Sequence, residues 1–304
     1  MDVLVYGAGS LGGLVGGLLA RAHDVTLVGR DPHMQHVREA GLEIEGAVEA
    51  HTHPRAVTNG RDREAEVALV TTKAYDTDAA ASALATGEFE AVLSLQNGLT
   101  EERLVAALDA QVLSGTATYG ARLRGPGRVE CTGVGEVTLG ALGGGRDPIA
   151  DRIGAAFRDA GINTTVADDM PRRRWEKLAV NAGINAPTAL ASLENGDVAT
   201  GPAAAVACDA ATEVAEVARA EGIDLSDRDA IEAVERVAAA TAENHSSMRQ
   251  DVDADHRTEV EAVYGELLER AGEHGLAAPT CRTLAELIRA WEVNAGVRDN
   301  EETV

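Results

Sequence analysis

The feature that most constrains the fold is a glycine-rich segment close to the amino terminus. Residues 2–6, DVLVY, form a short apolar run that leads directly into GAGSLG at residues 7–12. A helix-like segment then extends to about residue 21, and a second apolar run covers residues 24–28. A GxGxxG sequence between a strand and a helix, followed by another strand, is typical of a nucleotide-binding unit. We therefore expect the chain to begin with an α/β domain built on a parallel sheet.

Each glycine of this motif has its own task in such a unit. Gly7 permits the tight turn, Gly9 lets the backbone approach a pyrophosphate, and Gly12 lets helix and strand pack closely. The amino end of the helix offers N–H groups and partial positive charge to the phosphates. The motif therefore predicts that a dinucleotide is bound by the whole loop, namely Gly7, Ala8, Gly9, Ser10, Leu11 and Gly12.

The choice of dinucleotide depends on the end of the second strand, where Gly29-Arg30-Asp31 stands. An acidic side chain at this point usually binds the ribose of NAD, whereas an arginine can pair with the 2′-phosphate of NADP. Arg30 favours NADP, and Asp31 leaves NAD open. We predict NADPH as the cofactor.

Two later apolar runs, residues 66–72 and 91–95, lead into Lys73 and Asn97. Ligands of parallel sheets bind beyond the carboxyl ends of the strands, so we expect both side chains at the edge that carries the glycine loop. Taken alone, Lys73 could be a solvated lysine, and Asn97 before Gly98 could be a turn residue.

From about residue 171 onward, strand patterns give way to helical periodicity. In RRRWEKLAVNAGINAPT, residues 172–188, Asn181 follows Lys177 by four positions and Asn185 follows Asn181 by four. Residues four apart share one face of a helix, so an ammonium and two amides form a polar stripe that can hold a small oxygen-rich molecule. For these residues alone, a solvated face is the simpler interpretation.

Lysine usage draws attention to the same positions. The chain has 27 basic residues, and only Lys73 and Lys177 among them are lysines. A lysine ammonium can give up a proton near neutral pH, whereas an arginine cannot. The two lysines are therefore candidates for sites where a compact, titratable cation is needed.

The charge of the chain excludes several classes of partner. With 50 acidic residues the formal net charge is −23, which repels nucleic acid and anionic membranes. Aromatic residues make up only 3% of the chain. An acidic, lysine-poor and aromatic-poor surface indicates adaptation to high salt, because molar salt screens repulsion beyond about 3 Å. We therefore expect a halophilic protein whose activity rises with salt.

The cysteines and the amino terminus bear on the compartment. Cys131, Cys208 and Cys281 are widely spaced and lack metal-ligand spacings, so we expect free thiols and no metal site. The sequence starts directly in a strand pattern, without a secretory signal, and has no apolar run of bilayer length. These features predict a cytoplasmic protein.

Several segments resemble the ketopantoate reductase family, the NADPH-dependent 2-hydroxyacid dehydrogenases of the pantothenate pathway. They are WEKLAVNAGINAPTAL from residue 175, SSMRQD from residue 246 with RTE from residue 257, TTKAYDTDA from residue 71, and SLQNGL from residue 94. The resemblance extends from Met1 to about Trp291. It implies a Rossmann-type NADP-binding domain followed by an all-α substrate and catalytic domain, with an active site between them. The change of pattern along the chain sets their expected bounds at 1–167 and 168–298, and the acidic residues 299–304 are expected to form a tail.

The resemblance also assigns roles to individual residues. Lys177 would polarise a ketone and donate a proton to it, and Glu259 would pair with Lys177. Further cofactor contacts would come from Arg30, Lys73, Asn97, Ala121 and Glu259. The substrate would be bound by Asn97, Lys177, Asn181, Asn185, Asn195 and Ser247. Without their neighbouring motifs, Glu259 would be interpreted as a surface acid and Asn195 as a turn residue.

The implied reaction is the reduction of ketopantoate to (R)-pantoate. Family members often have Asp and Asn where this chain has Glu261 and Tyr264, and Asn-Pro where it has Asn185-Ala186-Pro187. We expect the bulkier Tyr264 to reshape one wall of the cleft. This leaves open a dehydrogenase for another small 2-keto acid, and a non-catalytic NADP(H) sensor is a further alternative. A homodimer is compatible with the sequence.

Overall fold

The computed structural model describes residues 1–298, so the expected acidic tail at 299–304 lies outside the described residues. The chain divides into two compact units. The first comprises Met1–Gln96 and Thr100–Met170, and the second comprises Asn97–Leu99 and the chain from Pro171 onward. The division thus falls three residues after the expected boundary at 167, and the short Asn97 segment belongs to the helical unit.

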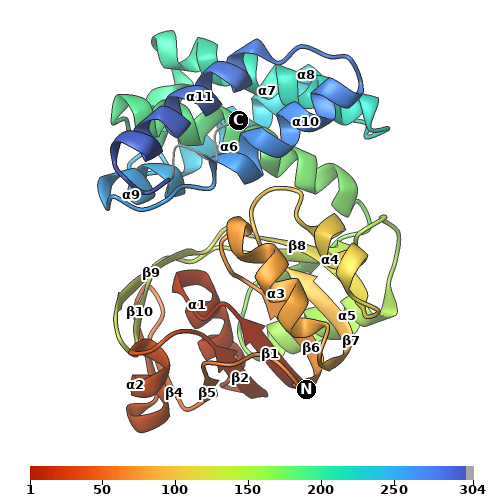
Figure 1. The fold of residues 1–304 in the computed structure, drawn as a ribbon, viewed down its shortest axis with the longest axis vertical. Coiled ribbons are helices and arrows are strands. Elements are labelled where there is room, and N and C mark those ends of the chain that lie inside the picture. Colours follow the sequence, from red (N-terminus) through yellow and green to blue (C-terminus); the bar gives the residue numbers. More distant parts are fainter. Residues whose placement is uncertain (299–304) are drawn as a thin grey trace. The chain divides into compact units, whose positions relative to one another are not determined.

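The first unit is built on an 8-stranded sheet with the strand order β12-β11-β8-β7-β6-β1-β2-β5. Six of these strands, β1, β2 and β5 to β8, are labelled in Figure 1. Its strands are β1 (Asp2–Tyr6), β2 (Asp24–Val28), β5 (Arg55–Val57), β6 (Glu64–Val70), β7 (Glu88–Ser94), β8 (Gln111–Ala117), β11 (Val137–Ala141) and β12 (Thr164–Val166). From β5 to β8 all neighbours are parallel, in the doubly wound order of Rossmann folds.

The strands between residue 111 and residue 141 divide between two sheets. Strand β8 pairs parallel with β7, and β11 alone runs antiparallel to β8. The intervening strands leave for a second, 4-stranded sheet with the order β4-β3-β10-β9. Its members are β3 (Leu42–Gly46), β4 (Ala50–Thr52), β9 (Gly120–Gly125) and β10 (Arg128–Gly133).

The helices of this unit are α1 (Ser10–Leu19), α2 (His33–Ala40), α3 (Thr77–Leu84), α4 (Glu101–Ala107) and α5 (Pro148–Asp159), with a 3-10 turn η1 (Ala74–Asp76). Strands β6 and β7 each begin with an exposed glutamate and end in a buried apolar half. The carboxyl-terminal halves of both strands are therefore buried in the parallel sheet. Because the two strands are parallel, the loops that follow them leave the sheet at the same edge.

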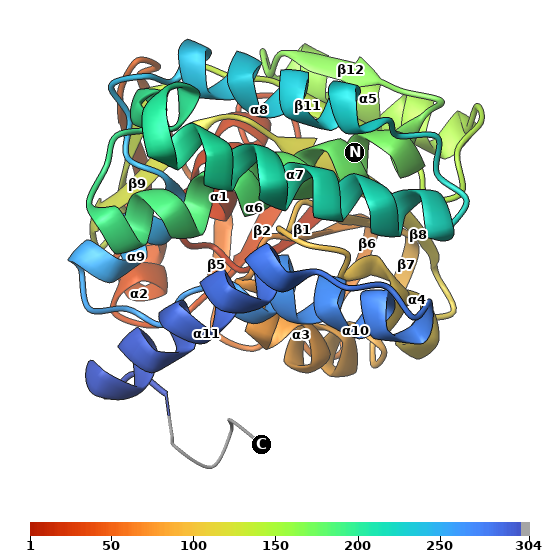
Figure 2. The same cartoon turned by 90° about the horizontal axis from the view of Figure 1, so that it is seen from above.

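Within the described residues, the second unit contains helices and loops but no strands. Its elements are α6 (Met170–Ala191), η2 (Asn195–Ala199), α7 (Gly201–Ala220), α8 (Asp227–Ala240), α9 (Ser247–Asp253), the π-helical turn η3 (Glu261–Gly265), α10 (Glu266–Glu273) and α11 (Pro279–Asn294). Helices α7 and α8 lie alongside each other (Figure 2). Their alanine-rich buried faces allow close packing. The helical elements of this unit confirm the expected all-α domain.

Polar side chains accept hydrogen bonds from N–H groups at the starts of two helices of this unit. Glu213 of α7 is 9% exposed and accepts bonds of 2.8 Å from the N–H groups of Thr280 and Cys281, at the start of α11. The exposed Ser226 accepts from Asp229 N at 3.1 Å and caps α8. The cysteines are free thiols. Within residues 1–298, no helix combines the length and apolar character needed to cross a bilayer.

Candidate functional site

The glycine loop follows β1 and has almost no room for side chains at two of its positions. Gly7 has φ +108°, and a Cβ atom there would lie 2.5 Å from Thr72 N. A Cβ at Gly12 would lie 2.3 Å from Gly7 O, which is far inside van der Waals contact. The Thr71 hydroxyl donates to Gly7 O at 3.0 Å and so fixes the turn. These two glycines are required by the fold of the loop itself.

Gly9 differs from the other two glycines. Apart from its chain neighbours, the one described atom that a Cβ at Gly9 would approach is Gly7 O, 4.0 Å away. Gly9 is also the N-cap of α1, so it has no side chain that could accept from the N–H groups of the first helical turn. The N–H groups of this turn, which no Gly9 side chain can cap, suit a phosphate, because a helix amino terminus attracts anions. The loop therefore fits a dinucleotide pyrophosphate.

The ends of β2 and β6 carry the expected charged residues. The Arg30 side chain is 89% exposed and pairs with Asp76 of η1 at 3.3 Å. Asp31 pairs instead with Arg38 of α2 at 3.0 Å. Both side chains thus have an ionic partner, and they differ in exposure, since the Arg30 side chain is 89% exposed and that of Asp31 is 51% exposed. The more exposed Arg30 is the better placed of the two to meet a cofactor. Lys73 directly precedes η1, beyond the end of β6.

A buried glutamine that sequence reasoning missed holds the loop after β6. Gln96 is 7% exposed, and its Nε2 donates to Thr72 Oγ1 at 3.1 Å and to Thr77 Oγ1 at 3.0 Å. Its Oε1 accepts from the Thr100 hydroxyl at 3.0 Å. The network ties together the segments on either side of Lys73. The only signal in the sequence was a polar residue at the end of an apolar run.

Ala121 lies on β9, and this strand is joined to the glycine loop. Ser10 Oγ, in the first turn of α1, accepts a bond of 3.0 Å from Leu123 N. Ala121 itself is half-buried against the core that includes Leu14 and Val15 of α1. The structure thus places Ala121 on the strand next to the loop, as expected for a backbone contact to a cofactor.

In the helical unit, α6 carries the polar stripe of Lys177, Asn181 and Asn185. Asn185 is 6% exposed. Asn181 Nδ2 is buried and has no hydrogen-bond partner among residues 1–298. A buried donor without an acceptor is costly and rare in folded proteins, so this amide is suited to bind a ligand oxygen. Leu178, Ala179 and Ile184 of α6 pack into the core of the helical unit.

Glu259 and Asn97 lie together in this unit. Asn97 Nδ2 donates to Glu259 Oε2 at 2.8 Å, and Glu259 is 8% exposed. A surface acid would be far more exposed, so the interpretation of Glu259 as an ordinary surface residue fails. The pairing of Glu259 with Lys177 stays a prediction.

The remaining candidates come from the segments around α9 and η2. Asn195 donates from Nδ2 to Thr241 Oγ1 at 2.9 Å, while its Oδ1 is buried without a hydrogen-bond partner in the described chain. Ser247 is exposed at the first position of α9. The preceding Ser246 caps α9 and bonds to the Thr188 hydroxyl of α6 at 2.7 Å. This contact, which sequence reasoning missed, ties the Ser247 segment to α6.

Tyr264 was expected to reshape a wall of the cleft, and this prediction is wrong. The side chain is 0% exposed and lies in the core of the helical unit. Its hydroxyl donates to Ala182 O of α6 at 2.7 Å. A phenol can be buried in this way when its O–H finds an acceptor. Tyr264 therefore contacts the backbone of α6 and faces no solvent.

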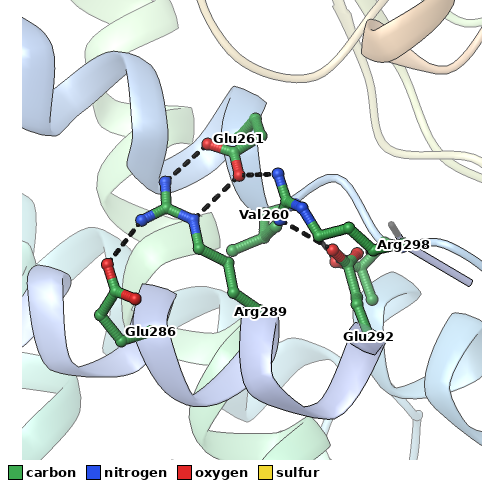
Figure 3. Close-up of polar contacts among 7 residues, drawn as sticks. Val260, Glu261, Glu286, Arg289, Glu292 and Arg298 are labelled. Atoms are coloured by element: carbon green, nitrogen blue, oxygen red, sulfur yellow. Dashed lines mark hydrogen bonds and ion pairs between the residues drawn. The ribbon is translucent and has the colours of Figure 1, made fainter. Parts of the chain in front are cut away.

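Glu261, the other departure, belongs to an ionic network (Figure 3). Its carboxylate accepts from Arg289 and from the nearly buried Arg298. Burial alone would raise the pKa of the Glu261 carboxyl, but the hydrogen bonds from the two guanidinium groups outweigh burial and hold the pKa below its ordinary value. Arg298 also donates to Glu292 at 3.0 Å. Glu292 in turn accepts from Thr258 N at 2.8 Å and so fixes the residue before Glu259.

Comparison with known proteins covers both units. Residues 3–144 match the family Ketopantoate reductase PanE/ApbA, and residues 169–292 match Ketopantoate reductase PanE/ApbA C terminal. A 2-dehydropantoate 2-reductase from Halobacterium salinarum is 44% identical over 299 residues, which are 95% of this chain and 98% of that protein.

Solved structures of similar proteins cover nearly the whole chain. A PanE/ApbA family ketopantoate reductase from Ralstonia eutropha is 30% identical with a TM-score of 0.88, and the match covers 97% of this chain and 100% of that one. The ternary structure of D-mandelate dehydrogenase with NADH and anilino(oxo)acetate is 25% identical with a TM-score of 0.90, covering 98% and 100%.

Proposed function

Because the chain belongs to the ketopantoate reductase PanE/ApbA family, we propose that it catalyses the NADPH-dependent reduction of 2-dehydropantoate, or ketopantoate, to (R)-pantoate. The reaction is a step of pantothenate and coenzyme A biosynthesis. The observation that carries the proposal is the stripe of Lys177, Asn181 and Asn185 on α6, in which a buried amide donor has no acceptor among the described residues.

NADPH supplies the hydride that reduces the ketone carbon. The backbone of residues 7–12 holds the pyrophosphate at the amino end of α1, and Arg30 pairs with the 2′-phosphate. Lys73, Asn97, Ala121 and Glu259 make the remaining cofactor contacts. The greater exposure of the Arg30 side chain compared with that of Asp31 supports NADPH over NADH. NADH stays the alternative, since the related D-mandelate dehydrogenase was solved with NADH.

The side chains of the helical unit act on the substrate. The Lys177 ammonium polarises the ketone and gives a proton to its oxygen, so the product is the 2-hydroxy acid. Proton donation of this kind contributes about 10²–10⁴-fold to a rate. Glu259 keeps the ammonium charged and oriented. The carboxylate and hydroxyl of the substrate are held by Asn97, Asn181, Asn185, Asn195 and Ser247.

The test is NADPH oxidation by the purified protein in molar salt with ketopantoate as substrate. We expect turnover that requires ketopantoate and yields (R)-pantoate. If no 2-keto acid supports NADPH oxidation although NADPH binds, the chain is the non-catalytic sensor and the proposal is wrong.

A second candidate is a dehydrogenase for another 2-keto acid. The similarity to D-mandelate dehydrogenase favours this candidate, because the pair reaches a TM-score of 0.90. Tyr264 no longer supports it, since the side chain is buried in the core. A panel that compares ketopantoate with aromatic and straight-chain 2-keto acids decides between the two, and we expect the highest kcat/KM for ketopantoate.

We further propose that the enzyme works in the cytoplasm as a homodimer. Its formal net charge of −23 argues against nucleic acid as a partner. Light scattering during size-exclusion chromatography in molar salt tests the oligomeric state, and a single monomeric peak would contradict the dimer.

A further inference from the structure

Helix α6 is irregular in the turn that carries Asn185. Pro187 lies inside the helix, so the carbonyl oxygen of residue 183 lacks the N–H partner that residue 187 would otherwise offer. The Thr188 hydroxyl bonds back to Ile184 O at 2.7 Å, a contact that tends to bend helices. In this turn the backbone conformation of α6 therefore depends on Pro187 and on the Thr188 hydroxyl as well as on the hydrogen bonds between backbone groups.

The Tyr264 hydroxyl contacts both ends of the neighbouring ladder step. It donates to Ala182 O at 2.7 Å and makes a long contact of 3.4 Å with Ala186 N. In an unbroken α-helix these two groups would bond to each other. The residue before each of them is an asparagine of the polar stripe, Asn181 or Asn185. One phenol oxygen thus contacts the two backbone groups that directly follow Asn181 and Asn185 in the chain.

The position of the phenol is itself strongly fixed. Tyr264 belongs to the π-helical turn η3, and its side chain is 0% exposed. Turns of this kind are rare and often occur at functional sites. Burial raises the pKa of the Tyr264 phenol well above its ordinary value, so the hydroxyl keeps its proton and stays a donor. The network of Glu261, Arg289 and Arg298 anchors the first residue of the same turn (Figure 3).

We propose that Tyr264 is a positioning residue for substrate binding: its hydroxyl, built into the backbone of α6, sets the angle between the amides of Asn181 and Asn185. The inference rests on the proposed function, because it takes these two amides to hold the carboxylate of the 2-keto acid. Glu259 lies five positions before Tyr264, so the phenol also ties the segment that carries Glu259 to α6.

The decisive variant is Tyr264→Phe, which removes only the hydroxyl. Misaligned amides bind the carboxylate more weakly before and during the reaction, so KM for ketopantoate should rise about tenfold while kcat changes little. KM for NADPH should not change. A variant that merely loses folded protein would lower the apparent kcat and leave both KM values unchanged.

Two further variants separate positioning from stability. Ile288→Val removes one methylene from the same buried core, so it should lower Tm without changing KM for ketopantoate. In an Asn185→Ala background, Tyr264→Phe should raise KM for ketopantoate by much less than tenfold. Both changes act on the same interaction, the one between the Asn185 amide and the substrate carboxylate. Full additivity of the two effects on KM would overturn the proposal.

Amide hydrogen exchange tests the inference independently of activity. Tyr264→Phe should speed exchange in residues 182–186 relative to α7, and Ile288→Val should not do so selectively. Native exchange rates in this segment of the Tyr264→Phe variant, together with a native KM, would overturn the positioning role. If the native protein turns over no 2-keto acid, the proposed function fails, and the exchange result alone decides whether the phenol orders α6.

Discussion

In the α/β unit the groups that we propose to bind the ligand are mostly backbone, whereas in the helical unit they are side chains positioned by contacts from other side chains. The glycine loop depends on Gly7 and Gly12. A Cβ atom would lie 2.5 Å from Thr72 N at the first position and 2.3 Å from Gly7 O at the second. The stripe on α6 depends on contacts from distant segments, such as Tyr264 to Ala182 O and Ser246 to Thr188. A site made of backbone depends on local sequence, and a site made of side chains depends on tertiary packing.

The largest effect should follow from a Cβ atom where the loop has no room. Gly12→Ala would bring a Cβ within 2.3 Å of Gly7 O, a backbone atom that cannot rotate away. We expect a loss of unfolding free energy near the upper end of the about 1–3 kcal/mol that overpacking costs. Urea unfolding measures this loss, and native stability would show that backbone packing does not shape the loop.

Gly9→Ala sharpens the comparison, because the same methyl group meets no close atom of the fold. The nearest contact would be Gly7 O at 4.0 Å, so the variant should keep the native unfolding midpoint. A pyrophosphate that approaches the Gly9 backbone would instead meet this methyl group. We expect NADPH affinity, measured by titration calorimetry, to fall about tenfold through lost phosphate hydrogen bonds. Unchanged affinity would mean that the pyrophosphate does not approach Gly9.

Arg30→Ala tests the one charged side chain on which cofactor choice should depend. A guanidinium bonded to a 2′-phosphate is a charge-assisted contact, so its loss should raise KM for NADPH about tenfold and leave KM for NADH unchanged. The exposed Arg61 offers a matched control, and Arg61→Ala should leave both values as they are. Equal changes for both cofactors after Arg30→Ala would contradict the assignment.

The smallest effect concerns acid stability of the helical unit. The pKa of the Glu261 carboxyl is lowered from 4.5 in the folded protein. Its contribution to stability is therefore complete above pH 4.5 and is lost as the pH falls through the lowered folded value. Glu261→Gln lacks this contribution at every pH. The difference in urea midpoint between native and variant should be largest near neutral pH and shrink in acid, and a difference that grows in acid would be inconsistent with this network.

The same contrast explains how far sequence reasoning reached. The strand–loop–helix pattern at residues 2–21 was sufficient to predict a parallel sheet and the glycine loop, because local geometry imposes both. The stripe on α6 followed from four-residue spacing. The role of Tyr264 could not be predicted, since a side chain at one position gives no sign that it bonds to a helix 82 residues away. The second sheet was missed for the same reason, because it joins β3 to the distant β10.

The central claim is that a lysine ammonium on α6 gives the proton to a ketone, and the most direct measurement is steady-state turnover of Lys177→Ala and Lys177→Arg with ketopantoate and NADPH. Both variants should lose about 10²–10⁴-fold in kcat, because neither alanine nor arginine can donate a proton near neutral pH. Both should still bind NADPH with native affinity. Native kcat in either variant would contradict the account.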